Sequence, residues 1–144
     1  MAFEAKLDIG GSKYDVLECE YEFSQSIDQA GKPSTRPRGG LLNLILKSTG
    51  DSDMLFQEWM FKDIEAKSGS IEFVISGEGE KREKKVVHFE DAFCVNFYEY
   101  FNHNNSILMY MKITLSAAVI RFGDNGAKFK NDWALGLSDL LSFL

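Results

Sequence analysis

The chain has 144 residues and a formal net charge of −6, with a hydrophobic content of 44% and an aromatic content of 13%. This length is enough for one domain whose core needs no disulfide or metal, and the apolar content excludes a disordered chain. The acidic charge argues against a nucleic-acid-binding protein, because such proteins gain affinity by neutralising phosphates with a basic face.

The first part of the chain predicts two β-strands joined by a glycine turn. Residues 3–9 alternate apolar and polar side chains, which is typical of a strand with one buried face. Gly10 and Gly11 then turn the chain into a second strand over residues 14–25. We expect the apolar side chains of this strand on one face: Leu17, Cys19, Tyr21 and Phe23. The opposite face carries a row of glutamates that should meet water or a basic partner: Glu18, Glu20 and Glu22.

A polar segment from Gln25 to Gly40 follows, and it contains both prolines of the chain. A connection of this length without its own periodicity is uncommon in a compact domain and indicates either function or disorder. Residues 28–31 predict a turn inside it. After that turn its charged residues are all basic: Lys32, Arg36 and Arg38. A basic arm on an acidic protein can serve as a docking device, and a disordered surface loop is the alternative.

The middle of the chain predicts a strand followed by a helix. Residues 40–49 are apolar on both faces, so a helix or another subunit should cover the second face. The helix should begin at Asp51 or Ser52, which can cap its first amides, and end near Lys67. Its apolar residues form one stripe at helical spacing: Phe56, Trp59, Met60 and Ile64. We interpret this stripe as core that packs on a sheet, rather than as a ligand site.

Three more strands are predicted in the second half, over residues 71–77, 86–101 and 107–122. In the middle one we expect Phe93, Val95, Phe97 and Phe101 on one face, and Cys94, Tyr98 and Tyr100 on the other. A bulge at Asp91 and Ala92 should shift this alternation. The last strand would approach roughly 50 Å at the usual rise per residue, which suits a barrel or a sheet shared between subunits.

The carboxyl-terminal part follows a turn at residues 123–126. From Trp133 onward, apolar residues recur at helical spacing and predict a short amphipathic helix: Trp133, Leu137, Leu140, Leu141 and Leu144. Exposed leucines at a chain end are a liability unless they dock on another surface.

The sequence predicts no enzyme, catalytic residue, cofactor or metal ligand. Cys19 and Cys94 lack metal or redox spacing, and we interpret them as buried free thiols of a reducing compartment, with a disulfide as the alternative. His88 lies in a strand and His103 in a polar turn, and no catalytic motif accompanies either. The carboxylates lie on surface faces, without the apolar pocket that raises a pKa for acid catalysis. A site assembled from distant residues is the alternative that spacing leaves open.

Neither export by a signal peptide nor membrane insertion is expected. The first residues lack the basic start and continuous apolar run of a signal peptide. No apolar run approaches the roughly 20 residues that a transmembrane helix requires. We therefore expect a protein that is soluble when made.

Several strings occur in a characteristic order: AKLDIGGSKYDVLECEYEFSQSID, GKPSTRPRGGLLNLILKSTGD, FQEWM, GSIEF, KITLSA and NDW. In this order they resemble the tube proteins of type VI secretion, the haemolysin-coregulated-protein (Hcp) family, in the TssD form of Bacteroidetes. The resemblance covers Met1 to about Trp133. It implies a tube domain over residues 1–133, with residues 134–144 as an apolar extension that family members lack.

The resemblance implies a mainly β fold, a small antiparallel β-barrel with one α-helix packed against it and a long extended loop. It also implies hexameric rings that stack into a hollow tube, which a contractile sheath expels with effector proteins in its lumen. Expected partners are other copies of the chain, sheath, spike and baseplate proteins, and effectors, with neither nucleic acid nor membrane. The chain would be made and assembled in the cytoplasm, and secreted through the type VI machine without a cleaved signal peptide.

Within such a tube, we expect the segment from Gln25 to Gly40 to contact the neighbouring ring. Its basic residues, Lys32, Arg36 and Arg38, would meet carboxylates such as Glu18, Glu20 and Glu22. Two alternatives remain open. One is a phage-like tail-tube protein, and the other is a monomeric barrel that binds a small apolar ligand between the aromatic faces of residues 93–101.

Overall fold

The structure is a computed structural model that describes residues 4–62, 65–77, 79 and 82–134. Its elements in chain order are β1 (Ala5–Ile9), β2 (Ser12–Tyr21), β3 (Leu41–Lys47), α1 (Leu55–Phe61), β4 (Lys67–Ser76), β5 (Glu83–Phe101), β6 (Met109–Phe122) and β7 (Lys128–Lys130). The strand β7, which is only three residues long, was not predicted from the sequence. Among the described residues, no helix is long and apolar enough to cross a membrane.

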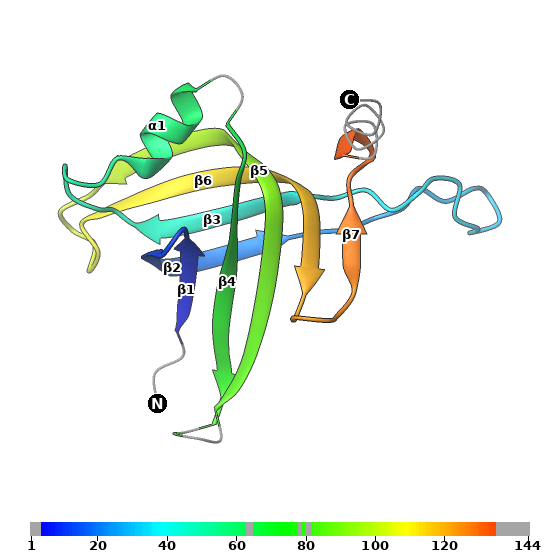
Figure 1. Cartoon of the computed structure of the whole chain (residues 1–144), viewed down its shortest axis with the longest axis horizontal. Coiled ribbons are helices and arrows are strands. Elements are labelled where there is room, and N and C mark those ends of the chain that lie inside the picture. The colour runs from blue at the N-terminus through cyan, green and yellow to red at the C-terminus, as the bar shows by residue number, and fades with distance from the viewer. Residues whose placement is uncertain (1–3, 63–64, 78, 80–81, 135–144) are drawn as a thin grey trace.

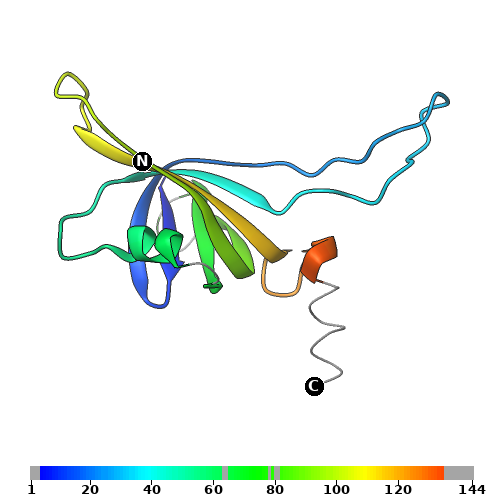
Figure 2. The ribbon, with the colours of Figure 1, turned by 90° about the horizontal axis from the view of Figure 1, so that it is seen from above.

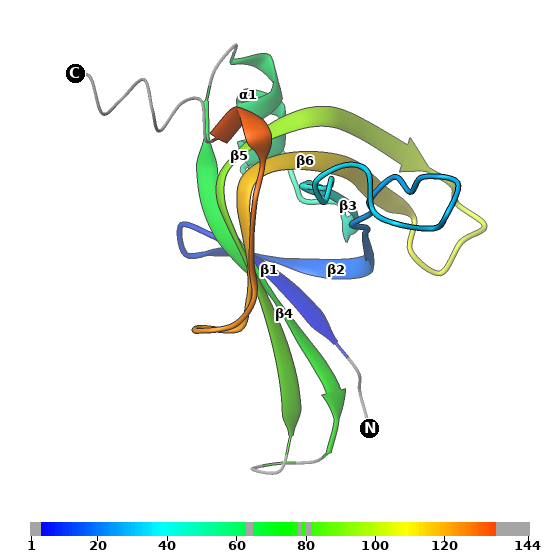
Figure 3. The same ribbon diagram turned by 90° about the vertical axis from the view of Figure 1, so that its right-hand side faces the viewer.

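The strands form one antiparallel sheet in the order β3-β2-β1-β4-β5-β6-β7. An additional pairing of β3 with β6 closes the first six strands of this order into a barrel, and β7 adds to the outer end of β6 (Figure 1). β5 is long and strongly curved, so that its first half pairs with β4 and its second half only with β6 (Figure 3). The expected fold, a small antiparallel barrel with one helix packed against it, is confirmed.

Alternate residues of the strands fill the barrel core. On β3 and β6 the inward side chains are almost fully buried: Leu42, Leu44, Leu46, Met111, Ile113 and Leu115. The α1 rings of Phe56 and Trp59 join this core, and Phe56 lies edge-on to Tyr14 at 4.9 Å between ring centroids. The interpretation of the helix stripe as core is therefore confirmed. Burying one large apolar side chain contributes about 1.5–3 kcal/mol to the stability of the fold. Ile64 of the predicted stripe lies outside the described residues.

The helix is shorter than the sequence predicts. Neither Asp51 nor Ser52 caps it, because it begins after Met54, and the Leu55 amide hydrogen bonds to the Asp53 carboxylate at 3.2 Å. After Phe61 the chain turns back, and the Trp59 indole donates a hydrogen bond to the Glu65 carbonyl oxygen at 2.7 Å. Lys67 lies in β4 instead of the helix end, since strand pairing with β5 already begins there.

Two bulges overturn predicted side-chain faces. The β2–β3 pairing shifts between Val16 and Glu18, so Leu17 is 43% exposed instead of buried. The bulge predicted in β5 is confirmed, because Asp91 has a φ of 50° and the β4 register shifts beside it. A second shift between Cys94 and Asn96 was not predicted. One extra residue in a strand reverses the alternation that follows it.

The second bulge corrects the faces predicted for residues 93–101. Cys94 lies in the core, whereas Val95 is 48% exposed. Beyond the bulge Phe97 packs against the core, while Tyr98 and Tyr100 are exposed on the opposite face. Phe93, Val95, Phe97 and Phe101 were predicted on one face, and they are therefore divided between the two faces of β5.

The polar segment between β2 and β3 is an ordered hairpin arm, which we define as residues 22–40. Ser24 and Arg38 exchange two backbone hydrogen bonds at 2.9 and 2.7 Å. The turn at its tip is confirmed, since the Gly31 amide donates to the Asp28 carbonyl oxygen at 3.0 Å. The Asp28 carboxylate also accepts the amides of Ala30 and Lys32, each at 2.9 Å. Figure 2 shows the arm reaching well away from the barrel.

Candidate assembly surfaces

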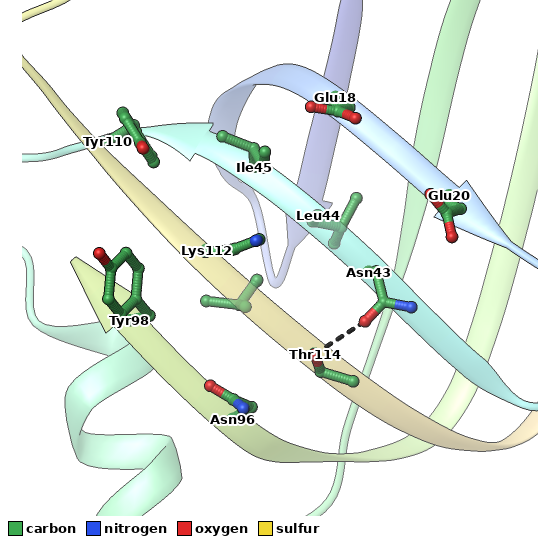
Figure 4. A pocket seen from close by; sticks show the side chains of 11 residues that line it. Glu18, Glu20, Asn43, Leu44, Ile45, Asn96, Tyr98, Tyr110, Lys112 and Thr114 are labelled. Carbon is green, nitrogen blue, oxygen red and sulfur yellow. Dashed lines mark hydrogen bonds between the residues drawn. The ribbon is translucent and has the colours of Figure 1, made fainter. Parts of the chain in front are cut away.

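Among the described residues, none covers the hollow on the outer face of four strands, β2, β3, β6 and β5, which we call the open face. Figure 4 draws the side chains that line it. The open face lies opposite the core because strand side chains alternate: Leu44 points inward, whereas Asn43 and Ile45 line this face. A hollow of about 660 Å³ occupies it, lined mainly by polar and aromatic side chains: Glu18, Glu20, Asn43, Ile45, Asn96, Tyr98, Tyr110, Lys112 and Thr114. The described helix packs on the other side, so it leaves this face of β3 open.

The open face carries charges of both signs and a row of aromatic rings. Glu18, Glu20 and Glu22 are all exposed on β2 and just beyond it, which confirms the predicted glutamate row. Lys112 of β6 is the cation that lines the same hollow. The Thr114 hydroxyl donates to the Asn43 side-chain oxygen at 2.9 Å and ties β6 to β3. Such a surface combines hydrated polar groups with apolar area from Ile45 and the tyrosine rings.

The sheet behind the open face has two edges that lack a partner among the described strands. β1 pairs with β2 only as far as Asp15, so residues 16–21 of β2 pair on one side alone, with β3. β4 pairs with β5 only as far as Ala92, so residues 93–101 of β5 pair on one side alone, with β6. Unpaired edges expose backbone N–H and C=O groups that can pair with another strand.

Aromatic packing fixes the base of the arm on the barrel. The Phe23 ring lies 5.0 Å from the Phe129 ring of β7 and 5.9 Å from the Phe122 ring of β6, measured between centroids. Tyr21 packs on the same Phe122 ring at 5.7 Å. Aromatic pairs of this kind contribute about 0.5–1.5 kcal/mol beyond the area that they bury. The short β7, which the sequence missed, therefore helps to orient the arm.

The segment after β7 also holds the other strand of the arm. The Asn131 side-chain amide donates to the carbonyl oxygens of Gly39 and Ala117, at 3.3 and 3.4 Å. Gly40 has a φ of 99°, and a Cβ there would lie 2.5 Å from the Asn131 amide nitrogen. A Cβ on Gly39 would overlap the Phe23 ring. Both glycines are therefore needed for the close approach of the arm to this corner.

The three basic residues predicted as a docking site are spread along the arm. Lys32 lies at the tip, next to the Asp28 turn. Arg36 forms an ion pair with Asp132 of the same chain at 3.6 Å, and about three quarters of each side chain is exposed. Arg38 lies at the base and lines a hollow with Glu20 and Glu22. The structure thus brings only Arg38 near the glutamate row of its own chain.

The sequence interpretation missed the two unpaired edges and the role of Asn131. Neither carries a local signal, because each depends on which strands pair and on where that pairing stops. Asn131 does occur within the NDW string of the resemblance, but spacing alone did not indicate its contact with Gly39.

The described residues show no arrangement typical of catalysis. Both cysteines are free, and burial raises the pKa of each thiol to about 11, so neither is a reactive thiolate near neutral pH. His88 lies 3.1 Å from the Asp124 carboxylate on the surface. No group of three or more His, Cys, Asp or Glu side chains in the described part of the chain is placed to hold a metal ion.

The aromatic pocket predicted for a small apolar ligand is not assembled. Phe93 packs on Trp133 at 5.6 Å, whereas Phe97 turns toward the core. Tyr98 stacks on Tyr100 at 6.4 Å, and both belong to the exposed side of β5. These rings therefore contribute to separate surfaces.

Comparisons with known proteins agree with this architecture. Residues 1–134 match the family model described as hemolysin coregulated protein Hcp (TssD). The solved structure of Hcp1 from Flavobacterium johnsoniae is 33% identical, with a TM-score of 0.79 over 89% of this chain and 99% of that chain. No curated protein matches the chain.

Two more distant structures share the fold. Hcp1 from Salmonella typhimurium is 14% identical, with a TM-score of 0.66 over 90% of this chain and 92% of that chain. Another Hcp protein is 16% identical, with a TM-score of 0.70 over 92% of this chain and 98% of that chain. The family model and the Flavobacterium johnsoniae structure confirm the resemblance seen in the sequence: the chain belongs to the Hcp (TssD) family, the tube proteins of type VI secretion.

Proposed function

We propose that six copies of the chain form a closed ring through the two unpaired edges of the open sheet, and that rings stack into a hollow tube. The observation that carries this proposal is the presence of both edges on one sheet. Three antiparallel steps separate β2 from β5, so the two edge strands run in opposite directions. β5 of one copy can therefore pair antiparallel with β2 of the next. Repeated around a ring, this contact pairs both of these edges in every copy.

We further propose that the open face lines the lumen. A continuous ring of sheets has one inner and one outer surface, and the core and α1 occupy the other side of each sheet. The exposed glutamates, Lys112 and hydrogen-bonding side chains would keep a lumen hydrated. A wall that mixes charged, hydrogen-bonding and aromatic side chains suits the passage of effector proteins, because its hydrated groups limit the hydrophobic surface that a passing protein can bury.

The arm is proposed as the joint between stacked rings. It is ordered and reaches far from the barrel (Figure 2). Lys32, Arg36 and Arg38 would meet the glutamate row of a copy in the neighbouring ring. The exposed Arg36–Asp132 pair contributes about 0–1 kcal/mol, so Arg36 can exchange this partner for one in the next ring at little cost.

The remaining expectations for the assembly are proposals as well. The chain would act as a structural component without enzyme activity, in contact with sheath, spike and baseplate proteins. It would assemble in the cytoplasm and leave through the type VI machine without a cleaved signal peptide. Residues 1–133 would form the tube domain, and residues 134–144 an apolar extension of it.

The mass of the full chain in solution tests the ring. We expect a particle near six times the chain mass of 16.3 kDa, with rings or tubes in negative-stain images. A species that keeps the mass of one chain at high protein concentration, without rings in the images, would overturn the proposal.

A further inference from the structure

A small apolar hollow lies beside the unpaired edge of β2. Its volume is about 290 Å³, and most of its lining is apolar and comes from β1, β2 and β4: Ala5, Val16, Leu17, Cys19, Phe73, Val74 and Ile75. Two carboxylates, Glu4 and Glu18, also line it. Leu17 and Ile75 are 43% and 49% exposed, although both are large and apolar. Apolar side chains that gather in an open hollow mark a surface that a partner covers.

The hollow exists because β2 separates from β1. The pairing of these strands ends at Asp15, and the bulge between Val16 and Glu18 turns Leu17 outward. Val16 and Cys19, which also line the hollow, pack against the core. The hollow therefore lies at the edge of β2 and reaches the core side of the sheet through Val16 and Cys19, while Glu18 is shared with the open face.

A second exposed apolar site lies at the opposite edge of the same sheet. Phe101 ends β5 and is 59% exposed, and its partner across the hairpin, Met109, is 39% exposed. Phe97 packs against the core, and alternate residues of a strand share a face. Phe101 therefore lies on the core side of the sheet, which the hollow also reaches.

The register of the sheet places the hollow and Phe101 at similar positions along the strand direction. Val16 pairs with Leu46, Leu46 with Met111, and Met111 with Glu99. Phe101 lies two residues beyond Glu99 on β5. A shift of two residues between neighbouring edges keeps every side chain on its own face. An adjoining copy can thus bring Phe101 over the hollow without reversing its strand.

We propose that Phe101 of one copy fills the hollow beside Leu17 of the next copy around the ring. This inference rests on the proposed ring and identifies an apolar anchor for its subunit contact. The two sites are unlike and lie on opposite edges, so the contact is head-to-tail, which closes into a ring instead of forming a two-fold dimer. A large aromatic side chain in an apolar hollow is a typical hot spot of an interface.

Cysteine cross-linking tests the contact. Leu17→Cys and Phe101→Cys are combined in the full chain on a Cys19→Ser background, because the Cys19 thiol lines the same hollow. Mild oxidation should then link successive copies and give a ladder of up to six chains on a denaturing gel. A mixture of the two single variants, assembled together, should give covalent dimers and nothing larger. Each single variant alone should stay uncross-linked.

The outcome distinguishes failure of the Phe101 contact from failure of the proposed ring. Rings in negative-stain images without cross-links above the level of the single variants would overturn the Phe101 contact and leave the proposed function standing. A preparation of the unsubstituted chain that stays monomeric at high protein concentration would overturn both.

Charge substitution provides a second test. Leu17→Glu and Phe101→Glu should each lower the fraction of ring at a fixed protein concentration by tenfold or more, because a carboxylate would be buried in an apolar contact. Phe61→Glu is the matched control, since Phe61 is 80% exposed at the end of α1. If the control lowered the ring fraction equally, or if Leu17→Glu left it unchanged, the contact would be excluded.

Discussion

Asn131 donates its side-chain amide to the carbonyl oxygen of Gly39 at 3.3 Å, although 92 residues separate them in the chain. The same amide lies 3.4 Å from the carbonyl oxygen of Ala117 in β6. One side chain therefore connects the arm, the strand behind it and the segment after β7. This corner determines how the arm leaves the barrel.

Replacing Asn131 should loosen the arm without unfolding the barrel. Asn131→Ala removes the two hydrogen bonds to Gly39 and Ala117, each worth about 0.5–1.5 kcal/mol, and the local one that the side-chain oxygen accepts from the Asp132 amide. The melting temperature should therefore fall by a few degrees. Hydrogen exchange of the Ser24 and Arg38 amides should accelerate more than exchange in β3. Asn125→Ala, in the exposed turn before β7, is the control. Equal exchange of the arm in both variants would contradict this role.

The two glycines at the arm base have no room for a side chain. Gly39→Ala would place a methyl group on the Phe23 ring and should destabilise the protein by about 1–3 kcal/mol. Gly50→Ala is the control, because a Cβ there meets nothing within 4 Å. Urea unfolding measures both variants. A Gly39 variant as stable as the Gly50 variant would show that the contact with Phe23 is dispensable.

Reversing the charge of the arm should weaken stacking and spare the rings. Arg36→Glu combined with Arg38→Glu would set two carboxylates against the glutamates of the next ring, and the repulsion should be stronger at low salt. Electron microscopy should show single rings where the unmodified protein forms tubes. The control reverses Lys13 and Lys84, which lie outside the arm, and changes the net charge equally. Tubes of normal length from the arm variant would contradict a role of the arm in stacking.

Labelling tests whether the open face lies inside the tube. Lys112→Cys places a thiol among the residues of the hollow in Figure 4. In assembled tubes it should react with a small maleimide, whereas a maleimide on a long polymer should reach it slowly. Glu58→Cys, on the exposed side of α1, should react with both reagents. Equal labelling of both positions by the polymer would place the open face outside.

The buried thiols predict a loss of stability in alkaline solution. The pKa of Cys19 and Cys94 rises from 9.0 to about 11 on folding, chiefly because burial disfavours the thiolate. Between pH 9 and 11 the unfolded chain therefore holds fewer protons on these groups than the folded chain. The free energy of unfolding then decreases as the pH rises through this window. Melting curves should show this decrease, and Cys19→Ser should reduce its slope.

Local patterns were sufficient for the regular parts of the fold. The alternation in residues 5–9, the Gly10–Gly11 turn and the glutamate row from Glu18 to Glu22 each depend on near neighbours, and the structure agrees with them. The TssD-like strings, read in order, were sufficient for the barrel and the family.

Features that depend on a distant partner could not be predicted in this way. The outward turn of Leu17 and the inward position of Cys94 follow from bulges, which only the register with β3 and β6 defines. The helix ends at Phe61 because the Trp59 indole finds the Glu65 carbonyl oxygen after the chain has turned back. The order of the arm depends on Ser24 and Arg38, fourteen positions apart, sharing backbone hydrogen bonds.

The arm acts mechanically as a lever with its pivot at the barrel. Its two strands are linked to each other at Ser24 and Arg38 and closed by the Asp28 turn, so a tilt at the pivot is carried along its length and becomes largest at Lys32. Small changes in the packing of Phe23 on Phe129 would therefore move the tip much farther than they move the barrel. If the tip contacts a neighbouring ring as proposed, the spacing of that contact would depend on the aromatic packing at the base of the arm.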